Sequence, residues 1–291
     1  FDATNVIKNT TCSVLTPISS DHTNLLGNSI IKIAKEKLGI IKNNSVAVIS
    51  KQINSVKKLI VSELRNKNVK LFQEGTHWSI VEKNYKERFF VLKYLESTYQ
   101  FPFPSLHGDH QIENASTAIA TILSFKNIFI KKKSIISGIV NTKWPARMQN
   151  LNNGKFIKMM GDKFEIWLDG GHNVHASEAI FKTLEEWNEK NIILIIGMVQ
   201  GKDPIKFVLK LIKKIKILII LPISDHQYIQ PYEMKNKLIS KLNKKIQIEC
   251  CLNINEALEL LKKKINHGKV MICGSLYLAG EVLERDGYKI N

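Results

Sequence analysis

The sequence predicts an α/β protein, and three observations support this class. Short apolar runs alternate with longer amphipathic stretches, as in strands that crossover helices join into a largely parallel sheet. The length of 291 residues suits two domains of roughly 150 residues each. A content of 44% hydrophobic and 24% charged residues allows sizeable cores, which excludes disordered, fibrous and disulfide-scaffold proteins.

The first half of the chain is expected to contain three strands with crossover helices, then a hairpin and two more helices. Pro102 and Pro104 separate the hairpin from those last helices. In chain order, we expect strand 12–18, helix 28–38, strand 46–50, helix 55–66, strand 69–73, a period-two hairpin at 78–83 and 88–94, and helices 114–125 and 132–140.

The second half restarts at Trp144-Pro145 and then alternates strictly between strands and helices. Because Pro145 restricts the backbone, we place the boundary near Lys143, which gives domains 1–143 and 144–291. We expect a hairpin-like pair at 155–160 and 164–168, strands 191–197, 215–221, 247–251 and 270–273, and helices 177–187, 204–213, 232–242, 254–264 and 276–285. This pattern is typical of a Rossmann-like, doubly wound domain.

The formal net charge of +17 raises the question of a nucleic-acid or anionic-membrane partner. The excess is spread, with 20 basic and 10 acidic residues in 1–143 and 23 and 16 in 144–291. The densest runs, Lys131–Lys133 and Lys262–Lys264, lie between apolar residues at helical spacing, where lysine forms a solvated face. We therefore expect no nucleic-acid partner.

Cysteine usage and apolar runs indicate a cytoplasmic protein. The four cysteines show no CxxC spacing, which suits reduced thiols in a cytosol. The longest apolar runs, 192–199 and 217–223, are too short for a membrane span of about 20 residues. No signal-peptide pattern opens the chain, so we expect no membrane association.

Polar clusters follow three of the expected strands, at the edge where parallel sheets bind ligands. Asp21-His22 has the residue types of a metal ligand or base, although a turn with an exposed histidine is the favoured interpretation of this pair alone. At 273–275, Ser275 either caps the next helix or faces a ligand, and capping is favoured.

The third cluster, at 168–173, ends a strand in an acid, two glycines and two polar side chains. Gly170-Gly171 would let a ligand approach the backbone, and the following helix N-terminus favours an anion. A tight strand-to-helix turn capped by Asn173 or Ser177 explains the pattern equally well.

The sequence does not contain the common nucleotide-binding, hydrolase and metal-binding motifs. The segment 197–203 has three residues between its glycines where a Walker loop needs four, and Asp203 stands where that loop needs Ser or Thr. The chain contains no GxGxxG, GxSxG or HExxH motif and no zinc-ligand spacing. Periodicity and local motifs therefore lead only to a two-domain α/β protein with polar turns.

Six strings carry more information together. In chain order they are FDATN, ISSDHTNLLGNSIIKIAKEKLGIIK, LHGDHQIENASTAIA, WPARMQ, LDGGHNVHA and CGSLYLAGEVL. They resemble D-A-T-N, D-H-x-x-x-L-G with I-A-x-E-K-A-G-I-x-K, G-x-H-Q-x-x-N-A-x-x-A, W-P-G-R-x-Q, L-D-G-A-H-N-P-H-A and G-S-L-Y-L of the folylpolyglutamate synthase and dihydrofolate synthase family. These enzymes are ATP-dependent ligases related to the Mur ligases.

The resemblance implies part of a Mur-ligase-type central ATPase domain at 1–143 and a Rossmann-like C-terminal ligase domain at 144–291. Such ligases transfer the γ-phosphoryl group of ATP, with Mg²⁺, to a carboxylate of dihydropteroate or folate. The amine of L-glutamate then attacks the acyl phosphate. The resemblance thus implies a monomeric, cytoplasmic enzyme of folate biosynthesis and one-carbon metabolism, whose partners are these small molecules.

The resemblance also assigns residues to the metal and to catalysis. It implies that His22 ligates Mg²⁺ and that Lys37 is carbamylated, which turns an ammonium into an oxygen donor suited to a hard cation. Lys37, His172 and Ser275 are the implied catalytic residues, with His172 and Ser275 near the glutamate and phosphoryl end.

The remaining assignments concern ATP and the pterin. Asn114, Arg147 and Asp169 match ATP-contacting positions, and Phe1, Asp2 and Ala3 match positions beside the pterin. Closure of the joint at 144–147 is expected to complete the site.

The chain departs from the family pattern in ways that bear on activity. It begins at Phe1 without a methionine, and the family's Walker loop and first magnesium-binding acid would lie upstream, so residues 1–291 alone are not expected to catalyse ligation. Ala146 replaces a glycine, Gly171 an alanine, Val174 a proline and Leu38 an alanine of the family pattern.

Two other functions remain open from the residues. One is a non-catalytic remnant or binding module of the same fold. The other is a Mur-type ligase that acts on cell-wall precursors. Within the folate ligases, the sequence also leaves open whether dihydropteroate, folate or both are substrates.

Overall fold

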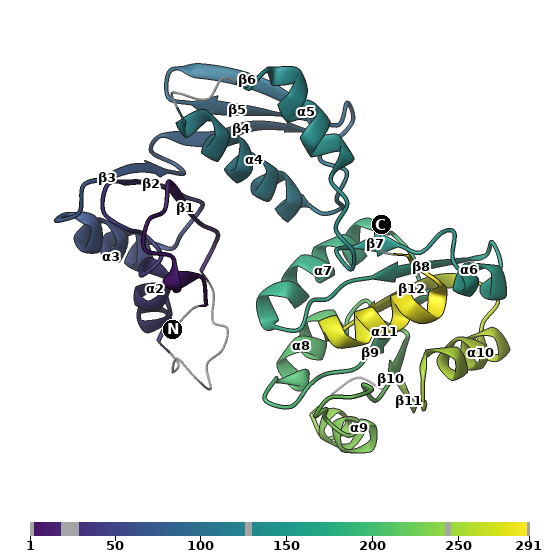
Figure 1. Cartoon of the computed structure of the whole chain (residues 1–291). Coiled ribbons are helices and arrows are strands. Elements are labelled where there is room, and N and C mark those ends of the chain that lie inside the picture. The colour runs from purple at the N-terminus through teal and green to yellow at the C-terminus, as the bar shows by residue number, and fades with distance from the viewer. Residues whose placement is uncertain (1–2, 19–28, 126–129, 242–245, 290–291) are drawn as a thin grey trace. The chain divides into compact units, whose positions relative to one another are not determined.

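The computed structural model describes residues 3–18, 29–125, 130–241 and 246–289 (Figure 1). The chain divides into two compact units, one of residues 1–105 with 109–143 and one of residues 144–291 with 106–108. Within these described ranges, no helix has the length and apolar character needed to cross a membrane.

A three-stranded parallel sheet opens the first unit. After a short 3-10 helix, η1 (Ala3–Val6), its strands are β1 (Cys12–Leu15), β2 (Ser45–Ile49) and β3 (Val69–Gln73), and its crossover helices are α2 (Ile30–Leu38) and α3 (Asn54–Leu64). Ala47 and Ile49 pack in the core that α2 and α3 share, whereas Val48 belongs to a second core on the other face. The apolar run of β2 is therefore buried on both faces, as in other parallel sheets.

An antiparallel sheet completes this unit. Its strands are β4 (Trp78–Asn84), β5 (Phe89–Tyr94) and β6 (Ser97–Pro102), and the helices that pack on it are α4 (Asp109–Ser124) and α5 (Lys132–Asn141). Ile112 and Ile119 of α4 share one core with Val48 of the parallel sheet and Phe90 of the antiparallel sheet. Helix α4 therefore joins the two sheets.

The second unit is built on six strands in the order β11-β10-β9-β12-β8-β7, all parallel except β7. The strands are β7 (Gln149–Asn150), β8 (Phe164–Leu168), β9 (Ile192–Ile196), β10 (Ile217–Ile220), β11 (Gln247–Cys250) and β12 (Gly268–Cys273). The helices are α6 (Lys155–Met160), α7 (Val174–Glu186), α8 (Pro204–Leu211), α9 (Pro231–Ile239), α10 (Ile254–Lys264) and α11 (Leu276–Asp286).

Helices cover both faces of this sheet (Figure 1). Ile192, Leu194 and Ile196 of β9 pack in the core that holds α7, α8 and α9. Ile193 and Ile195 pack on the opposite face with α6, α10 and α11. This three-layer arrangement confirms the predicted doubly wound fold.

The sheet changes winding direction on both sides of β12. Helix α11, which follows β12, packs on one face, whereas α7 and α8, which follow β8 and β9, pack on the other. Since β12 lies between β8 and β9, a topological switch point flanks it on each side. Open parallel sheets bind ligands outside the carboxyl ends of strands at such points. The turns after β8, β9 and β12 are therefore the expected ligand-binding edge of this unit.

One prediction for the second unit is wrong. Residues 155–160 form helix α6, where a hairpin strand was predicted. The Asp286 carboxylate accepts a hydrogen bond from the backbone N of Phe156 at 2.8 Å and so satisfies an amide of the first helical turn. Phe156 and Met160, at helical spacing, are both buried. The helix therefore depends on a carboxylate 130 residues further along the chain.

Candidate functional site

The structure places the predicted site residues in two groups, one in each unit. Lys37 and Asn114 belong to the first unit, and Arg147, Asp169, His172 and Ser275 belong to the second. Phe1, Asp2 and His22 lie outside the described residues, and Ala3 is described only as the first residue of η1.

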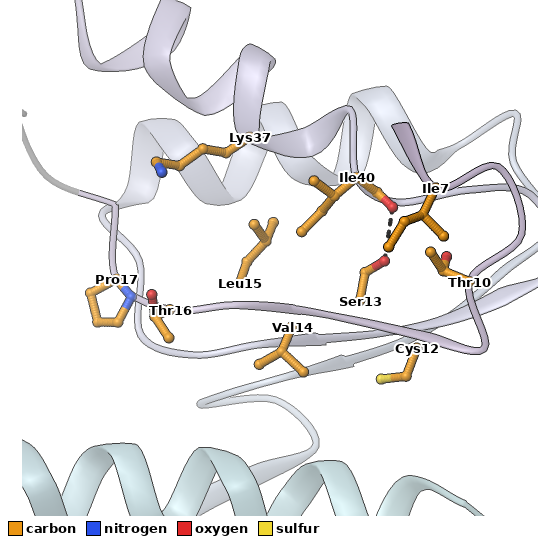
Figure 2. Close-up of a pocket in the computed structure, with 10 residues that line it drawn as sticks. All are labelled: Ile7, Thr10, Cys12, Ser13, Val14, Leu15, Thr16, Pro17, Lys37 and Ile40. Atoms are coloured by element: carbon orange, nitrogen blue, oxygen red, sulfur yellow. Dashed lines mark hydrogen bonds between the residues drawn. The ribbon is translucent and has the colours of Figure 1, made fainter. Parts of the chain in front are cut away.

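Lys37 lines a cavity of about 420 Å³ beside strand β1. Figure 2 shows its side chain extending from α2 toward the end of β1 where Thr16 and Pro17 lie. The Ser13 hydroxyl donates to the carbonyl oxygen of Ile40 at 2.9 Å, which ties β1 to the chain that follows α2. Lys37 thus lies beside the carboxyl end of the first strand, where parallel sheets place ligands.

Gln52, which has no recognisable sequence motif, fixes the chain after β1. Its Nε2 donates to the carbonyl oxygen of Thr16 at 2.9 Å, and its Oε1 accepts from the backbone N of Ile18 at 3.1 Å. Gln52 is buried, and these two bonds give a partner to both the amide nitrogen and the amide oxygen of its side chain. The last residues before the segment that contains His22 are therefore rigidly placed.

A carboxylate follows β3 at the same edge of the parallel sheet. Glu74 Oε2 accepts from the backbone N of Lys51 at 2.6 Å. Burial raises the pKa of Glu74 above its ordinary value, and the nearby Glu113 adds to this effect, while the bond to Lys51 opposes it. Glu74 was not predicted as a site residue, although its position directly after a strand is a signal that could have identified it.

Replacing Glu74 with glutamine is expected to raise the free energy of unfolding at pH 7. Because the folded state raises the pKa above 4.5, ionised Glu74 destabilises the native protein once the pH exceeds the native pKa. Below pH 4.5 the carboxyl is protonated in both states, so the advantage of Glu74→Gln is expected to vanish there. Urea unfolding at several pH values measures the difference in free energy of unfolding between Glu74→Gln and the wild-type protein, with Glu82→Gln at an exposed position as the control. A difference that does not depend on pH would contradict the prediction.

Asn114 is exposed on the first turns of α4, and its Nδ2 donates to Gln111 Oε1 at 3.1 Å. Gln111 is buried and also contacts His110. Asp109 holds the start of the helix, because its carboxylate accepts from Lys83 Nζ at 2.7 Å and from the Tyr85 hydroxyl at 2.6 Å. The motif H-Q-x-x-N contained Gln111, but only the structure shows that it touches Asn114.

Asp169 is buried at the end of β8 and binds the backbone of two other segments. Its Oδ1 accepts from the backbone N of Gly171 at 2.7 Å, and its Oδ2 accepts from the backbone N of Met148 at 2.9 Å. Met148 directly follows Arg147, whose side chain is exposed. The carboxylate therefore holds in place the loop that presents Arg147, a role that the sequence did not predict.

The turns after β8 and β12 are joined to each other. The backbone N of Gly274 donates to the carbonyl oxygen of Gly171 at 2.8 Å, and Ser275 Oγ accepts from the backbone N of Tyr277 at 3.1 Å. Ser275 thus caps α11, as the favoured interpretation predicted, and Asn173 caps α7 by accepting from Ala176 N at 2.8 Å. Burial also raises the pKa of the Cys273 thiol well above its ordinary value, so this thiol is neutral.

His172 lies beside this junction, with Nδ1 3.0 Å from the carbonyl oxygen of Gly170. A carbonyl oxygen only accepts, so Nδ1 is the donor in this contact and Nε2 is the ring nitrogen that the contact does not engage. His172 is partly buried, and its ring orientation is therefore set by the turn itself.

Ala146 adopts a left-handed conformation in the loop before β7, with φ of 55°. Its carbonyl oxygen accepts from Gly170 N at 2.9 Å, and its N donates to Gln149 Oε1 at 2.9 Å, which explains why the backbone stays in this region. Glycine adopts this conformation without strain.

Ala146→Gly is expected to change stability by less than about 1 kcal/mol, because relief of strain of about 1–2 kcal/mol is offset by a lost buried methyl and a more flexible unfolded chain. Ala146→Val is expected to lower stability by about 2 kcal/mol, since a β-branched residue tolerates positive φ poorly. Thermal unfolding of both variants measures these changes, and equal stabilities of the valine and glycine variants would show that the backbone at position 146 is not strained.

The chain is similar to known proteins over almost its whole length. A family described as "Dihydrofolate synthetase, C-terminal domain" matches residues 152–285. The chain is 27% identical over 301 residues to a probable dihydrofolate synthetase of Schizosaccharomyces pombe, covering 97% of this chain and 67% of that protein. It is also 27% identical over 295 residues to the dihydrofolate synthase/folylpolyglutamate synthase of Bacillus subtilis, covering 98% and 64%.

Solved structures show the same fold. Folylpolyglutamate synthase of Mycobacterium tuberculosis, complexed with ADP and AMPPCP, superposes with a TM-score of 0.86 and 22% identity, covering all of this chain and 66% of that one. E. coli FolC in complex with DHPP and ADP gives a TM-score of 0.80 and 20% identity, covering 97% and 63%. The chain therefore spans about two thirds of the length of these relatives.

Proposed function

Because the chain belongs to the folylpolyglutamate synthase and dihydrofolate synthase family, we propose that it is the larger part of an ATP-dependent carboxylate–amine ligase. The ligase joins L-glutamate to dihydropteroate, to folate, or to both. The γ-phosphoryl group of ATP passes to the pterin substrate's carboxylate, ADP leaves, and the glutamate amine displaces phosphate from the acyl phosphate to form an amide.

The observation that carries this proposal is the junction at the carboxyl edge of the second unit. Three motif segments, 146–149, 168–173 and 273–275, come from distant parts of the chain and are held together by hydrogen bonds. The junction lies at the switch points of the sheet, where this class of fold binds ligands. Arg147 is exposed there, with a guanidinium suited to phosphate.

Roles for two side chains follow from their hydrogen bonds. His172 Nε2, which the contact with Gly170 leaves unengaged, is proposed to take a proton from the glutamate ammonium, so that the neutral amine attacks the acyl phosphate. Ser275 Oγ accepts a hydrogen bond within its cap and keeps its own proton to donate to a phosphoryl oxygen. Asn114, Arg147 and Asp169 are proposed to serve the nucleotide, and Phe1, Asp2 and Ala3 the pterin.

Magnesium is the proposed metal ion, with His22 and carbamylated Lys37 as ligands. No group of three or more His, Cys, Asp or Glu side chains in the described parts of the chain could hold a metal ion. These parts alone therefore do not form a complete metal site, and no step of the proposed reaction is assigned to it.

The proposed setting is a cytosolic monomer that acts on small molecules alone. All four cysteines are unpaired, as is typical of a reducing compartment. The basic residues are spread over both halves of the chain, without the concentrated patch that nucleic acid requires. Sedimentation of the purified protein with and without nucleic acid tests both statements.

In the full-length protein, replacing Arg147 with alanine is expected to raise the KM for ATP about 10- to 100-fold, because a charge-assisted bond to phosphate contributes roughly 1.5–3 kcal/mol. The melting temperature is expected to stay unchanged, since Arg147 is exposed. Initial-rate kinetics at varied ATP measure the effect, and Arg65→Ala, at the exposed C-cap of α3, is the control. Unchanged ATP kinetics would remove Arg147 from the nucleotide site.

The decisive experiment is a ligation assay with the full-length protein, magnesium, ATP and L-glutamate. Dihydropteroate, tetrahydrofolate and a nucleotide-linked muropeptide are supplied separately, and products are identified by mass. We expect glutamate-dependent ADP release with a pterin substrate and none with the muropeptide. ADP release only with the muropeptide would favour a Mur-type ligase, and no release with any substrate would favour a non-catalytic protein.

A further inference from the structure

Three side chains at the start of α4 form a continuous chain of hydrogen bonds. Gln111 Nε2 lies 3.0 Å from His110 Nε2, and Gln111 Oε1 accepts from Asn114 Nδ2 at 3.1 Å. An amide nitrogen only donates, so His110 Nε2 is the acceptor in the first contact. The buried amide of Gln111, which is 5% exposed, therefore connects a ring nitrogen to the exposed amide of Asn114.

In this chain the Asn114 amide faces Gln111 with its Nδ2 side. Gln111 offers Asn114 a carbonyl oxygen, and only the Nδ2 side of Asn114 can bind it. With Gln111 in this orientation, rotation of the Asn114 amide alone by half a turn would place its Oδ1 against Gln111 Oε1, which puts two acceptors together. Asn114 is thereby held so that Oδ1 and one remaining Nδ2 hydrogen are directed away from Gln111.

The backbone beneath this amide is also fixed. Asp109 accepts from Lys83 and Tyr85 of the β4 strand and the turn that follows it, with side-chain exposures of 21% for Lys83 and 28% for Asp109. Ile112, in the next position after Gln111, is buried in the core of the unit. The first turn of α4 therefore cannot rotate to compensate for a misdirected amide.

An acceptor beside a donor matches one edge of adenine. Asparagine can pair with adenine through two hydrogen bonds. The side-chain Oδ1 accepts from the N6 amino group of adenine, and the side-chain Nδ2 donates to adenine N7. Guanine and hypoxanthine present an oxygen at position 6, which would face the Asn114 Oδ1 as a second acceptor. We propose that Gln111 is a positioning residue that orients Asn114 to select adenine over 6-oxopurine nucleotides. This inference rests on the proposed nucleotide role of Asn114.

The test measures selectivity between ATP and inosine triphosphate, which differ at position 6 of the base. In the full-length protein, Gln111→Met is expected to lower the ATP preference in kcat/KM by about 10-fold, because Asn114 then rotates freely. Gln111→Glu is expected to keep the preference, since a carboxylate oxygen accepts the same Asn114 bond. Gln247→Met, on the exposed end of β11, is the matched control.

A double variant separates positioning from general damage. Asn114→Ala is expected to abolish the preference, and adding Gln111→Met to it is expected to change nothing further. A role of Gln111 in stability alone would lower the melting temperature and leave the ATP preference of Gln111→Met intact, which would overturn the inference.

The wild-type protein provides a measurement that needs no variant. It is expected to prefer ATP over inosine triphosphate and to bind 7-deaza-ATP, which lacks the N7 acceptor, more weakly than ATP. Equal binding of the three nucleotides would overturn the inference even if Gln111→Met does not fold. Failure to use any nucleotide would instead contradict the proposed function, so the two failures are distinguishable.

Discussion

Gly274→Ala is expected to lower the free energy of unfolding by about 3 kcal/mol. Gly274 has φ of 109°, a region that L-residues rarely adopt. An added Cβ would lie 2.7 Å from the carbonyl oxygen of Gly197 and 2.7 Å from Ile196 Cγ1. Because one of these neighbours is backbone in a buried strand-to-turn junction, the clash cannot be relieved by a side-chain rotation.

Gly280→Ala is the matched control for this prediction. Gly280 lies in α11, six residues further along, and nothing stands within 4 Å of its added Cβ. Alanine is the better helix former, so this variant is expected to gain up to about 1 kcal/mol. Urea unfolding of both variants measures the contrast. Equal stabilities would show that the turn after β12 relaxes freely.

In the full-length protein, Asp169→Ala is expected to cost about 3 kcal/mol of stability and, on the proposed function, to lower kcat/KM for ligation at least about 100-fold. The substitution leaves the backbone N–H groups of Gly171 and Met148 without their acceptor, and hydrogen bonds to a charged group contribute roughly 1.5–3 kcal/mol each. Loss of the bond to Met148 also releases the loop that presents Arg147, so that the guanidinium no longer has a fixed position.

Asp162→Ala is the control, because Asp162 is exposed in the turn before β8. Activities are compared at a temperature where both proteins are folded, as circular dichroism shows. If Asp169→Ala loses stability but ligates at the wild-type rate, Asp169 serves the fold alone. If it loses neither, the two bonds to its carboxylate are without consequence.

Much of the fold could be predicted because its signals are local. The run 192–196 is apolar at every position, and a strand buried on both faces is the structure that satisfies it. Helix α10 begins and ends where its apolar spacing predicted, at Ile254 and Lys264. The caps at Asn173 and Ser275 could also be predicted, since each accepts from an amide two or three residues away.

The wrong predictions concern mainly elements whose type or bounds depend on a residue that is distant in the sequence. Residues 155–160 are apolar enough for either a strand or a helix, and the Asp286 carboxylate selects the helix by binding Phe156 N. Helix α4 begins at Asp109, five residues earlier than expected, because Lys83 and Tyr85 hold the Asp109 carboxylate. Strand β6 was missed because Pro102 ends it and resembles a loop signal.

For the candidate site, the sequence by itself determined the residue types and their places after strands, because strand ends and turns have local signatures. Only the tertiary structure decided what those residues touch. Asp169 was predicted as a nucleotide contact and is seen to bind the backbone of the Arg147 loop, while Gln111 and Gln52 were not selected at all. The physical reason is that a buried hydrogen bond depends on where two distant segments meet, and that meeting is set by the packing of the whole sheet and its helices.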